Sequence, residues 1–195
     1  MNDGLVLAVA SVGPEAEEIW NPISNQVIRF LPGANVIAAS GNSVAWIGGT
    51  ACLPHCAVHF TDVKTGMEQT IPLPSGVTTD DDGAFSPNGS TLALPVGIGG
   101  YWPGRHPAAV ALMNLRTKGV TLLPGTEQAP GPTYGPESAF WSSSGRLFVT
   151  VIGVTHVLTW GPGDHRATAL PKVRLPVLSL SPPQFQGDYP NLIAM

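Results

Sequence analysis

Gly83-Ala-Phe-Ser-Pro-Asn-Gly-Ser-Thr-Leu-Ala-Leu94 is the stretch of this sequence that decides the fold. Its centre, Pro87-Asn-Gly89, combines the preset φ of proline with two residues that tolerate a positive φ, which is the composition of a tight turn. The apolar Phe85 precedes this turn. After it, Leu92 and Leu94 alternate with smaller residues, which is the period-2 pattern of a strand. The stretch therefore predicts two short antiparallel strands joined by a tight turn.

The same hairpin pattern occurs three times in the chain. A second copy lies at Ala139-Phe-Trp-Ser-Ser-Ser-Gly-Arg-Leu-Phe-Val-Thr150, and a looser copy lies at Asn35-Val-Ile-Ala-Ala-Ser-Gly-Asn-Ser-Val-Ala-Trp46. Short strands that recur with turn signals between them are typical of all-β folds. The repetition indicates a repeat protein built from antiparallel strands.

Leu-Pro pairs mark the end of each repeat. Four segments end with such a pair, at Leu31-Pro32, Leu73-Pro74, Leu123-Pro124 and Leu170-Pro171, and the prolines of these four pairs are 42, 50 and 47 residues apart. Because proline cannot donate a hydrogen bond to a central ladder, each pair indicates the end of an edge strand. A strand-like run, a turn and a further strand precede each pair. A complete unit thus has four antiparallel strands in about 45 residues, which is the signature of a β-propeller blade.

Two segments carry a resemblance to known propellers. Asp62-Val-Lys-Thr-Gly66 resembles the strand-turn-strand segment of WD-repeat and TolB-like proteins, and Phe85-Ser-Pro-Asn-Gly89 is similar to their inner hairpin. The resemblance extends to about Leu175 and implies a bacterial β-propeller scaffold, not a particular reaction. The blades lack the Gly-His and Trp-Asp signatures of strict WD repeats, so TolB-like or lactonase-like propellers are closer in pattern.

We therefore expect an all-β chain with about four four-stranded propeller blades in residues 1–175 and a Pro-rich tail in residues 176–195. The complete blades are expected at residues 35–76, 83–125 and 138–171. Residues 4–33 are expected to form a partial first blade, because they contain only three strand-like runs.

The partial first blade has two explanations. In one, the tail segment 172–180 returns as the missing inner strand and closes a four-bladed ring. In the other, the chain is part of a propeller of about six to eight blades, which we prefer because four-bladed rings lie at the small end of the observed range. Blade edges are then exposed, and we expect them to allow self-association.

Composition excludes several classes of function. Charged residues make up only 11% of the chain, the net charge is −4 and no basic cluster occurs, so we expect no nucleic-acid partner. The 23 glycines and 20 prolines leave no room for long helices. The apolar run at residues 5–10 has no basic flank and is too short for a membrane span or a signal peptide, so it predicts a strand. We expect no cofactor.

The linker loops are the expected functional surface. In a propeller, the links between blades lie on the same face as the links between the second and third strands of a blade, and loops carry the function of such scaffolds. Aromatic, Arg and His side chains on Gly/Pro-framed loops are typical of binding surfaces. The binding candidates on this loop face are Tyr101, Trp102, Arg105, His106, Tyr134 and Glu137. The alternative is that the aromatic side chains only cover a blade edge.

The opposite face carries only tight turns. Ser142-Ser-Ser144 lies in one of them, away from the expected site. We therefore expect no functional residues on this face.

Cys52-Leu-Pro-His-Cys56 holds both cysteines of the chain. A disulfide between Cys52 and Cys56 is the preferred interpretation, and it implies an oxidising compartment. Two free thiols are the second possibility. A zinc site using Cys52, His55, Cys56 and His59 is the third, although the spacing is cramped and His59 falls within a predicted strand. The resemblance to extracytoplasmic bacterial propellers, which often bridge this loop, favours the disulfide and implies a location in the cell envelope or outside the cell, if the native full-length chain carries a signal peptide.

Two weaker site hypotheses concern acidic residues. Asp80, Asp81 and Asp82 are hard oxygen ligands suited to calcium, but a solvated turn between blades is the preferred interpretation, because their spacing lacks the EF-hand pattern. His106 and Glu137 are candidates for a catalytic pair on the loop face, with no motif to support them.

Three hypotheses of function follow from these residues. The preferred one is a non-catalytic binding or scaffold module that presents its loop face to a protein, peptide or glycan outside the cytoplasm. The second is a propeller enzyme of lyase or lactonase type, with a metal or a His/Glu site at the central channel. The third is a purely structural segment.

Overall fold

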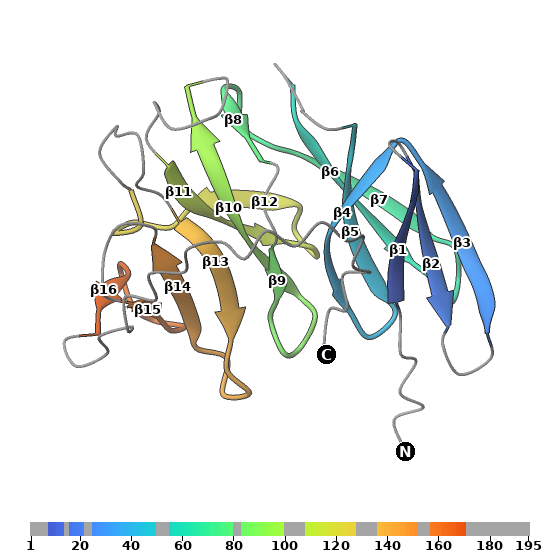
Figure 1. Cartoon of the computed structure of the whole chain (residues 1–195). Coiled ribbons are helices and arrows are strands. Elements are labelled where there is room, and N and C mark those ends of the chain that lie inside the picture. The colour runs from blue at the N-terminus through green and yellow to red at the C-terminus, as the bar shows by residue number, and fades with distance from the viewer. Residues whose placement is uncertain are drawn as a thin grey trace, which may run out of the picture.

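The computed structural model describes residues 8–13, 16–21, 25–49, 55–79, 83–99, 108–127, 136–151 and 157–170. These residues form sixteen strands in four antiparallel sheets and contain no helix. Accordingly, they include no helix with the length and apolarity needed to cross a membrane. Figure 1 shows the four sheets side by side in chain order. The predicted all-β propeller architecture is confirmed.

The strands follow the chain from sheet to sheet. The first sheet contains β1 (Ala8–Gly13), β2 (Ala16–Asn21) and β3 (Gln26–Pro32). The second contains β4 (Ala34–Ser40), β5 (Ser43–Gly48), β6 (Ala57–Asp62) and β7 (Glu68–Pro72). The third contains β8 (Val77–Thr78), β9 (Ala84–Phe85), β10 (Thr91–Ile98), β11 (Ala108–Asn114) and β12 (Gly119–Leu122). The fourth contains β13 (Pro136–Trp141), β14 (Leu147–Val151), β15 (Val157–Trp160) and β16 (Thr168–Ala169).

The hairpin predicted from residues 83–94 is formed by β9 and β10. Phe85 pairs with Leu92 across the two strands. The turn is closed by a hydrogen bond from the Ser86 N–H to the Thr91 carbonyl (2.8 Å). Gly89 has a φ of +66°, which an L side chain adopts only at a cost. The turn chemistry read from the sequence therefore produces the expected local structure.

The inner edge of the third sheet is divided between two short strands. β9 pairs with the first part of β10, whereas β8 pairs with Gly97 and Ile98 at its far end. Residues 80–82 connect the two strands and lie outside the described residues. β8 was not predicted from the sequence, because two residues are too few to carry a period-2 signal.

The core consists of apolar layers between neighbouring sheets. β10 has both faces buried: Leu92 and Leu94 belong to a cluster shared with the second sheet, and Ala93 belongs to a cluster shared with the fourth. In β14 only Leu147, Val149 and Val151 are buried, and the residues between them are partly exposed. β10, which lies between the second and fourth sheets, thus has two buried faces, whereas β14 has one.

Polar contacts also join neighbouring sheets. The Gly83 N–H donates to the Ile37 carbonyl (2.7 Å), between the third and second sheets. The Ala167 N–H donates to the Pro124 carbonyl (2.7 Å), between the fourth and third. Arg29 and Glu68 form an ion pair between the first and second. These two backbone hydrogen bonds and the ion pair link neighbouring sheets and help to keep the blades in register with one another.

The turn between β6 and β7 is organised by Asp62. Its Oδ1 accepts hydrogen bonds from the N–H of Thr65 (2.8 Å), from the N–H of Lys64 (3.0 Å) and from the Thr65 hydroxyl (3.0 Å). The hydrogen bond from the Thr65 backbone is the largest influence, and it holds the pKa of the Asp62 carboxyl below its ordinary value. In the matching turn of the third sheet, Asn114 Oδ1 accepts the same two kinds of backbone N–H bond. Asp62 therefore accepts with a charged carboxylate the two backbone hydrogen bonds that Asn114 accepts with a neutral amide oxygen.

We expect Asp62→Asn to lower the stability at pH 7 and to leave it unchanged in strong acid. A carboxylate with a depressed folded-state pKa stabilises the fold above its unfolded pKa, and this contribution is lost as the pH falls through the folded pKa. Urea unfolding midpoints of the wild type and the variant should converge as the pH is lowered. Asn114→Asp is the matched reverse change. It should add a contribution to the stability that is present at pH 7 and lost as the pH falls, as for Asp62 in the wild type. A constant difference between Asp62→Asn and wild type at all pH values would contradict this account.

Candidate functional site

A pocket lies between the third and fourth sheets, on the face that carries the hairpin turns. We call this edge of the sheets the turn face and the cavity the turn-face pocket. The cavity has a volume of about 420 Å³. On one side it is lined by residues of the β9–β10 turn: Ser86, Pro87, Asn88, Ser90 and Thr91. On the other side it is lined by residues of the fourth sheet: Trp141, Ser143, Ser144, Gly145, Trp160 and Pro162.

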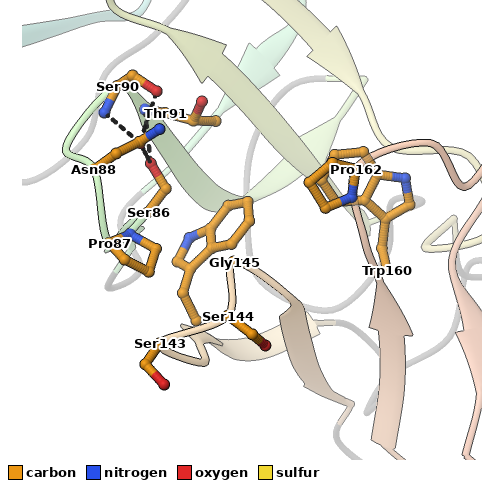
Figure 2. A pocket seen from close by; sticks show the side chains of 11 residues that line it. Ser86, Pro87, Asn88, Ser90, Thr91, Ser143, Ser144, Gly145, Trp160 and Pro162 are labelled. Carbon is orange, nitrogen blue, oxygen red and sulfur yellow. Dashed lines mark hydrogen bonds between the residues drawn. The ribbon is translucent and has the colours of Figure 1, made fainter.

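Strand topology explains why these turns meet. In a four-stranded antiparallel sheet, the first and third connections lie at the same edge. The β9–β10 and β13–β14 hairpins both reach the lower edge in Figure 1, and β9 contacts β13. Figure 2 shows the Ser86–Thr91 segment on one side of the pocket, Trp160 with Pro162 on the other, and Ser143 and Ser144 on the turn below. The pocket is thus a product of blade packing.

Two tryptophans provide the aromatic surface of the pocket. The rings of Trp141 and Trp160 meet edge to face, with their centroids 6.2 Å apart and their planes at 80°. Trp141 Nε1 donates to the Ala84 carbonyl (3.0 Å), and Trp160 Nε1 donates to the Asp164 carbonyl (2.8 Å). Both indoles are only partly exposed. The rings are therefore held in place by the backbone, with their N–H groups already used.

Asn88 organises the opposite wall. Its Oδ1 accepts hydrogen bonds from the Ser86 hydroxyl (2.8 Å), the Ser90 N–H (3.1 Å) and the Ser90 hydroxyl (2.8 Å). These three bonds orient the side-chain amide. The Asn88 Nδ2 group has no hydrogen-bond partner among the described residues, so both of its donors remain available at the exposed turn.

The lining carries no charge. Among the described residues that line the pocket, none has a titratable side chain. The nearby Arg146 and Asp164 form an ion pair (3.3 Å), and Asp164 Oδ2 also accepts the Gly161 N–H (2.8 Å). These two charges compensate one another beside the pocket. The arrangement is suited to contact with a neutral group and not to acid–base chemistry.

Most residues proposed from the sequence lie outside the described structure. This holds for Tyr101, Trp102, Arg105, His106, Tyr134, Cys52, Asp80, Asp81 and Asp82. Glu137 lies in β13, and its side chain is not described. The binding surface, the catalytic pair and the calcium site therefore stay predictions.

The cysteine segment is described in part. Cys56 is buried, at 2% exposure, whereas Cys52 lies outside the described residues, so the disulfide also stays a prediction. His55 is exposed. The ring of His59 stacks on Trp46, with centroids 4.1 Å apart, and its Nδ1 lies 3.1 Å from the Thr70 hydroxyl. His59 thus has packing and hydrogen-bonding partners within its own sheet.

The turn-face pocket lies on the face where we expected no functional residues. Its signal is present in the sequence, because Trp141 directly precedes the Ser142-Ser-Ser-Gly145 turn and Trp160 directly precedes Gly161-Pro-Gly163. Single turns do not reveal the pocket, since it exists only where turns of neighbouring blades meet.

The packed antiparallel sheets of three to five strands, repeated along the chain, define this chain as a β-propeller. Solved structures support this class. A dihydro-heme d1 dehydrogenase, NirN, in complex with DHE, is 17% identical with a TM-score of 0.57, covering 87% of this chain and 36% of that one. TolB from Acinetobacter baumannii is 15% identical with a TM-score of 0.56, covering 84% and 40%. The β-propeller domain of the Trilobed protease from Pyrococcus furiosus is 15% identical with a TM-score of 0.55, covering 87% and 54%.

These likenesses concern the fold alone, because the sequence identities are low. The chain spans less than half the length of NirN and of TolB. No protein-family model matches the sequence, and no curated protein matches it. The similarity to TolB agrees with the TolB-like propeller resemblance predicted from the sequence, at the level of architecture.

Proposed function

We propose that this propeller is a non-catalytic binding module that presents an end of its blades to a protein, peptide or glycan partner outside the cytoplasm. The observation that carries the proposal is the turn-face pocket, with its two ordered indole rings and uncharged polar wall. Aromatic side chains held in place lose little conformational freedom on binding, which makes them effective contact surfaces. The described lining residues provide a ligand with a concave surface, apolar contacts and hydrogen-bonding groups.

The loop face remains part of this proposal. Tyr101, Trp102, Arg105, His106, Tyr134 and Glu137 are proposed as a second contact region, on the ground of residue type and loop position alone. A disulfide between Cys52 and Cys56 is proposed to pin the adjacent loop, which fits an oxidising compartment. Intact mass before and after reduction tests it, because reduction adds two hydrogens to a bridged chain.

A screen of the purified chain against peptide and glycan arrays tests the binding function. We expect at least one ligand whose affinity falls by about tenfold or more in Trp160→Phe, if the turn face binds it, or in Trp102→Ala, if the loop face does. Trp46→Phe is the matched control, because this tryptophan lies in β5 of the second sheet and does not line the turn-face pocket. It should leave binding unchanged.

Two outcomes would overturn the proposal. One is a screen without a saturable ligand. The other is catalytic turnover of a lactone or a glycan that disappears in His106→Ala and Glu137→Ala, which would establish the alternative of a propeller enzyme of lyase or lactonase type.

A further inference from the structure

We infer that the turn-face pocket binds a neutral carbohydrate, with a sugar ring packed on the indole surfaces of Trp141 and Trp160. The inference rests on the proposed binding function and names the ligand class for one of its surfaces. It follows from four properties of the pocket, which are its indole surface, its hydrogen-bonding groups, its charge and its size.

The first property is the way in which the indoles are held. Each N–H donates to a backbone carbonyl of the protein, at 3.0 Å for Trp141 and 2.8 Å for Trp160. The rings therefore offer carbon surface to a ligand and no donor. The face of a pyranose ring presents C–H groups, which pack well against the electron-rich face of an aromatic ring.

The second property is the character of the remaining polar groups. Asn88 Nδ2 offers two donors, and the hydroxyls of Ser143 and Thr91 have no hydrogen-bond partner among the described residues. Each hydroxyl both donates and accepts a hydrogen bond. Sugar hydroxyls have the same dual character, so the rim of a sugar ring matches this wall.

The third property is the absence of charge among the described lining residues. A carboxylate or sulfate placed here would lose hydration without gaining a counter-charge, because Arg146 is already paired with Asp164. An acidic sugar is therefore disfavoured, and a neutral one is not.

The fourth property is size. Small-ligand pockets have volumes of roughly 300 to 1,000 Å³. At about 420 Å³, the turn-face pocket lies at the lower end of this range, which suits one or two sugar rings.

A proline-rich peptide is the competing occupant, since such peptides also dock on aromatic grooves. An extended peptide presents a row of carbonyl acceptors that need donors. Here both indole N–H groups are used within the protein, so the tryptophans offer no donor to such carbonyls. The hydroxyls of Ser143 and Thr91 both donate and accept hydrogen bonds, so they match sugar hydroxyls better than peptide carbonyls.

The test is a titration of the full chain with a panel of neutral oligosaccharides, followed by saturation-transfer NMR. The panel contains glucose, galactose, mannose, fucose and N-acetylhexosamine units, and sialylated or sulfated counterparts are tested beside each. We expect at least one neutral member to bind with a Kd of about 1 mM or below, and its acidic counterpart to bind at least about tenfold more weakly.

Asn88→Asp is the decisive variant. It keeps Oδ1, and with it the three hydrogen bonds that organise the turn, but it replaces the Nδ2 donors with a charged oxygen. We expect the affinity for the neutral sugar to fall about tenfold. Asn42→Asp is the matched control, because it adds the same charge to the β4–β5 turn outside the pocket, and it should leave binding unchanged. Trp160→Phe should also weaken binding, with the fold checked by circular dichroism.

The outcomes separate the two proposals. Sugar binding that is lost in Asn88→Asp and kept in Asn42→Asp supports the inference. Failure of every neutral sugar to bind, or binding that neither Asn88→Asp nor Trp160→Phe weakens, overturns it. If a peptide binds instead, and Trp160→Phe weakens that binding, the carbohydrate inference fails while the proposed binding function stands.

Discussion

Replacing Gly125 with alanine is expected to lower the free energy of unfolding by about 3 kcal/mol. Gly125 has a φ of +87°, a backbone conformation that costs an alanine roughly 1–2 kcal/mol. A Cβ at this position would lie only 2.4 Å from the carbonyl oxygen of Ala167, which is backbone and cannot rotate away. Forcing such a contact apart costs typically a further ~1–3 kcal/mol.

The clash falls on a junction between blades. Gly125 follows the third sheet, and Ala167 precedes β16 of the fourth sheet, where its N–H bonds to the Pro124 carbonyl at 2.7 Å. Moving Ala167 away therefore also strains this hydrogen bond. A loss of about 3 kcal/mol corresponds to roughly 6–12 °C in Tm for a chain of this size, which calorimetry or thermal circular dichroism measures readily.

Gly163→Ala is the matched control for this prediction. Gly163 has a similar φ of +98°, but a Cβ there would meet nothing within 4 Å. This variant should lower the free energy of unfolding by only ~1–2 kcal/mol, which is the cost of the positive φ for an alanine. Equal losses in the two variants would show that the contact between Gly125 and Ala167 contributes nothing, and would contradict the described packing of the fourth sheet on the third.

Leu94→Ala is the second large change, with an expected loss of about 2–5 kcal/mol. Leu94 is 0% exposed and lies in β10, in the apolar cluster that joins the second and third sheets. Truncation removes apolar contacts and leaves a cavity, because strands held by ladders on both sides cannot collapse into it. Urea unfolding should show a lower midpoint with an unchanged slope.

Met67→Ala provides the control for burial. Met67 is 70% exposed in the β6–β7 turn, so its truncation should change the stability by no more than about 0.5 kcal/mol. A Leu94→Ala loss as small as that of Met67→Ala would mean that the second and third sheets do not pack face to face as described.

The local structure of this chain was readable from its residues. Turn chemistry and period-2 alternation depend on near neighbours only, so Pro87-Asn-Gly89 and the leucines that follow it were enough to predict the β9–β10 hairpin. The Leu-Pro pairs likewise predicted the outer strands, since Leu73 and Leu123 directly follow the outer-edge segments β7 and β12. Elements without a local signal escaped prediction, as β8 did, because it exists only by pairing with the far end of β10.

The turn-face pocket could not be predicted from patterns of neighbouring residues in the sequence. Trp141 and Trp160 each look like strand-end aromatics, and Asn88 looks like an ordinary turn residue. That they line one cavity depends on the packing of the fourth sheet against the third, which sets the β9–β10 turn opposite the β13–β14 turn. The aromatic loop segment at residues 99–107 was predicted to bind a partner from its composition, which carries no information on the distances between side chains.

The sequence by itself determined that this chain is a set of antiparallel four-stranded units and a β-propeller, because strand period, turn residues and repeat length are written along the chain. Only the tertiary structure decided which strands have both faces buried, which glycine lies against a neighbouring blade, and where two tryptophans meet to form a pocket. The physical reason is that these properties arise from contacts between sheets, and each such contact joins residues whose separation in the sequence says nothing about their distance in space.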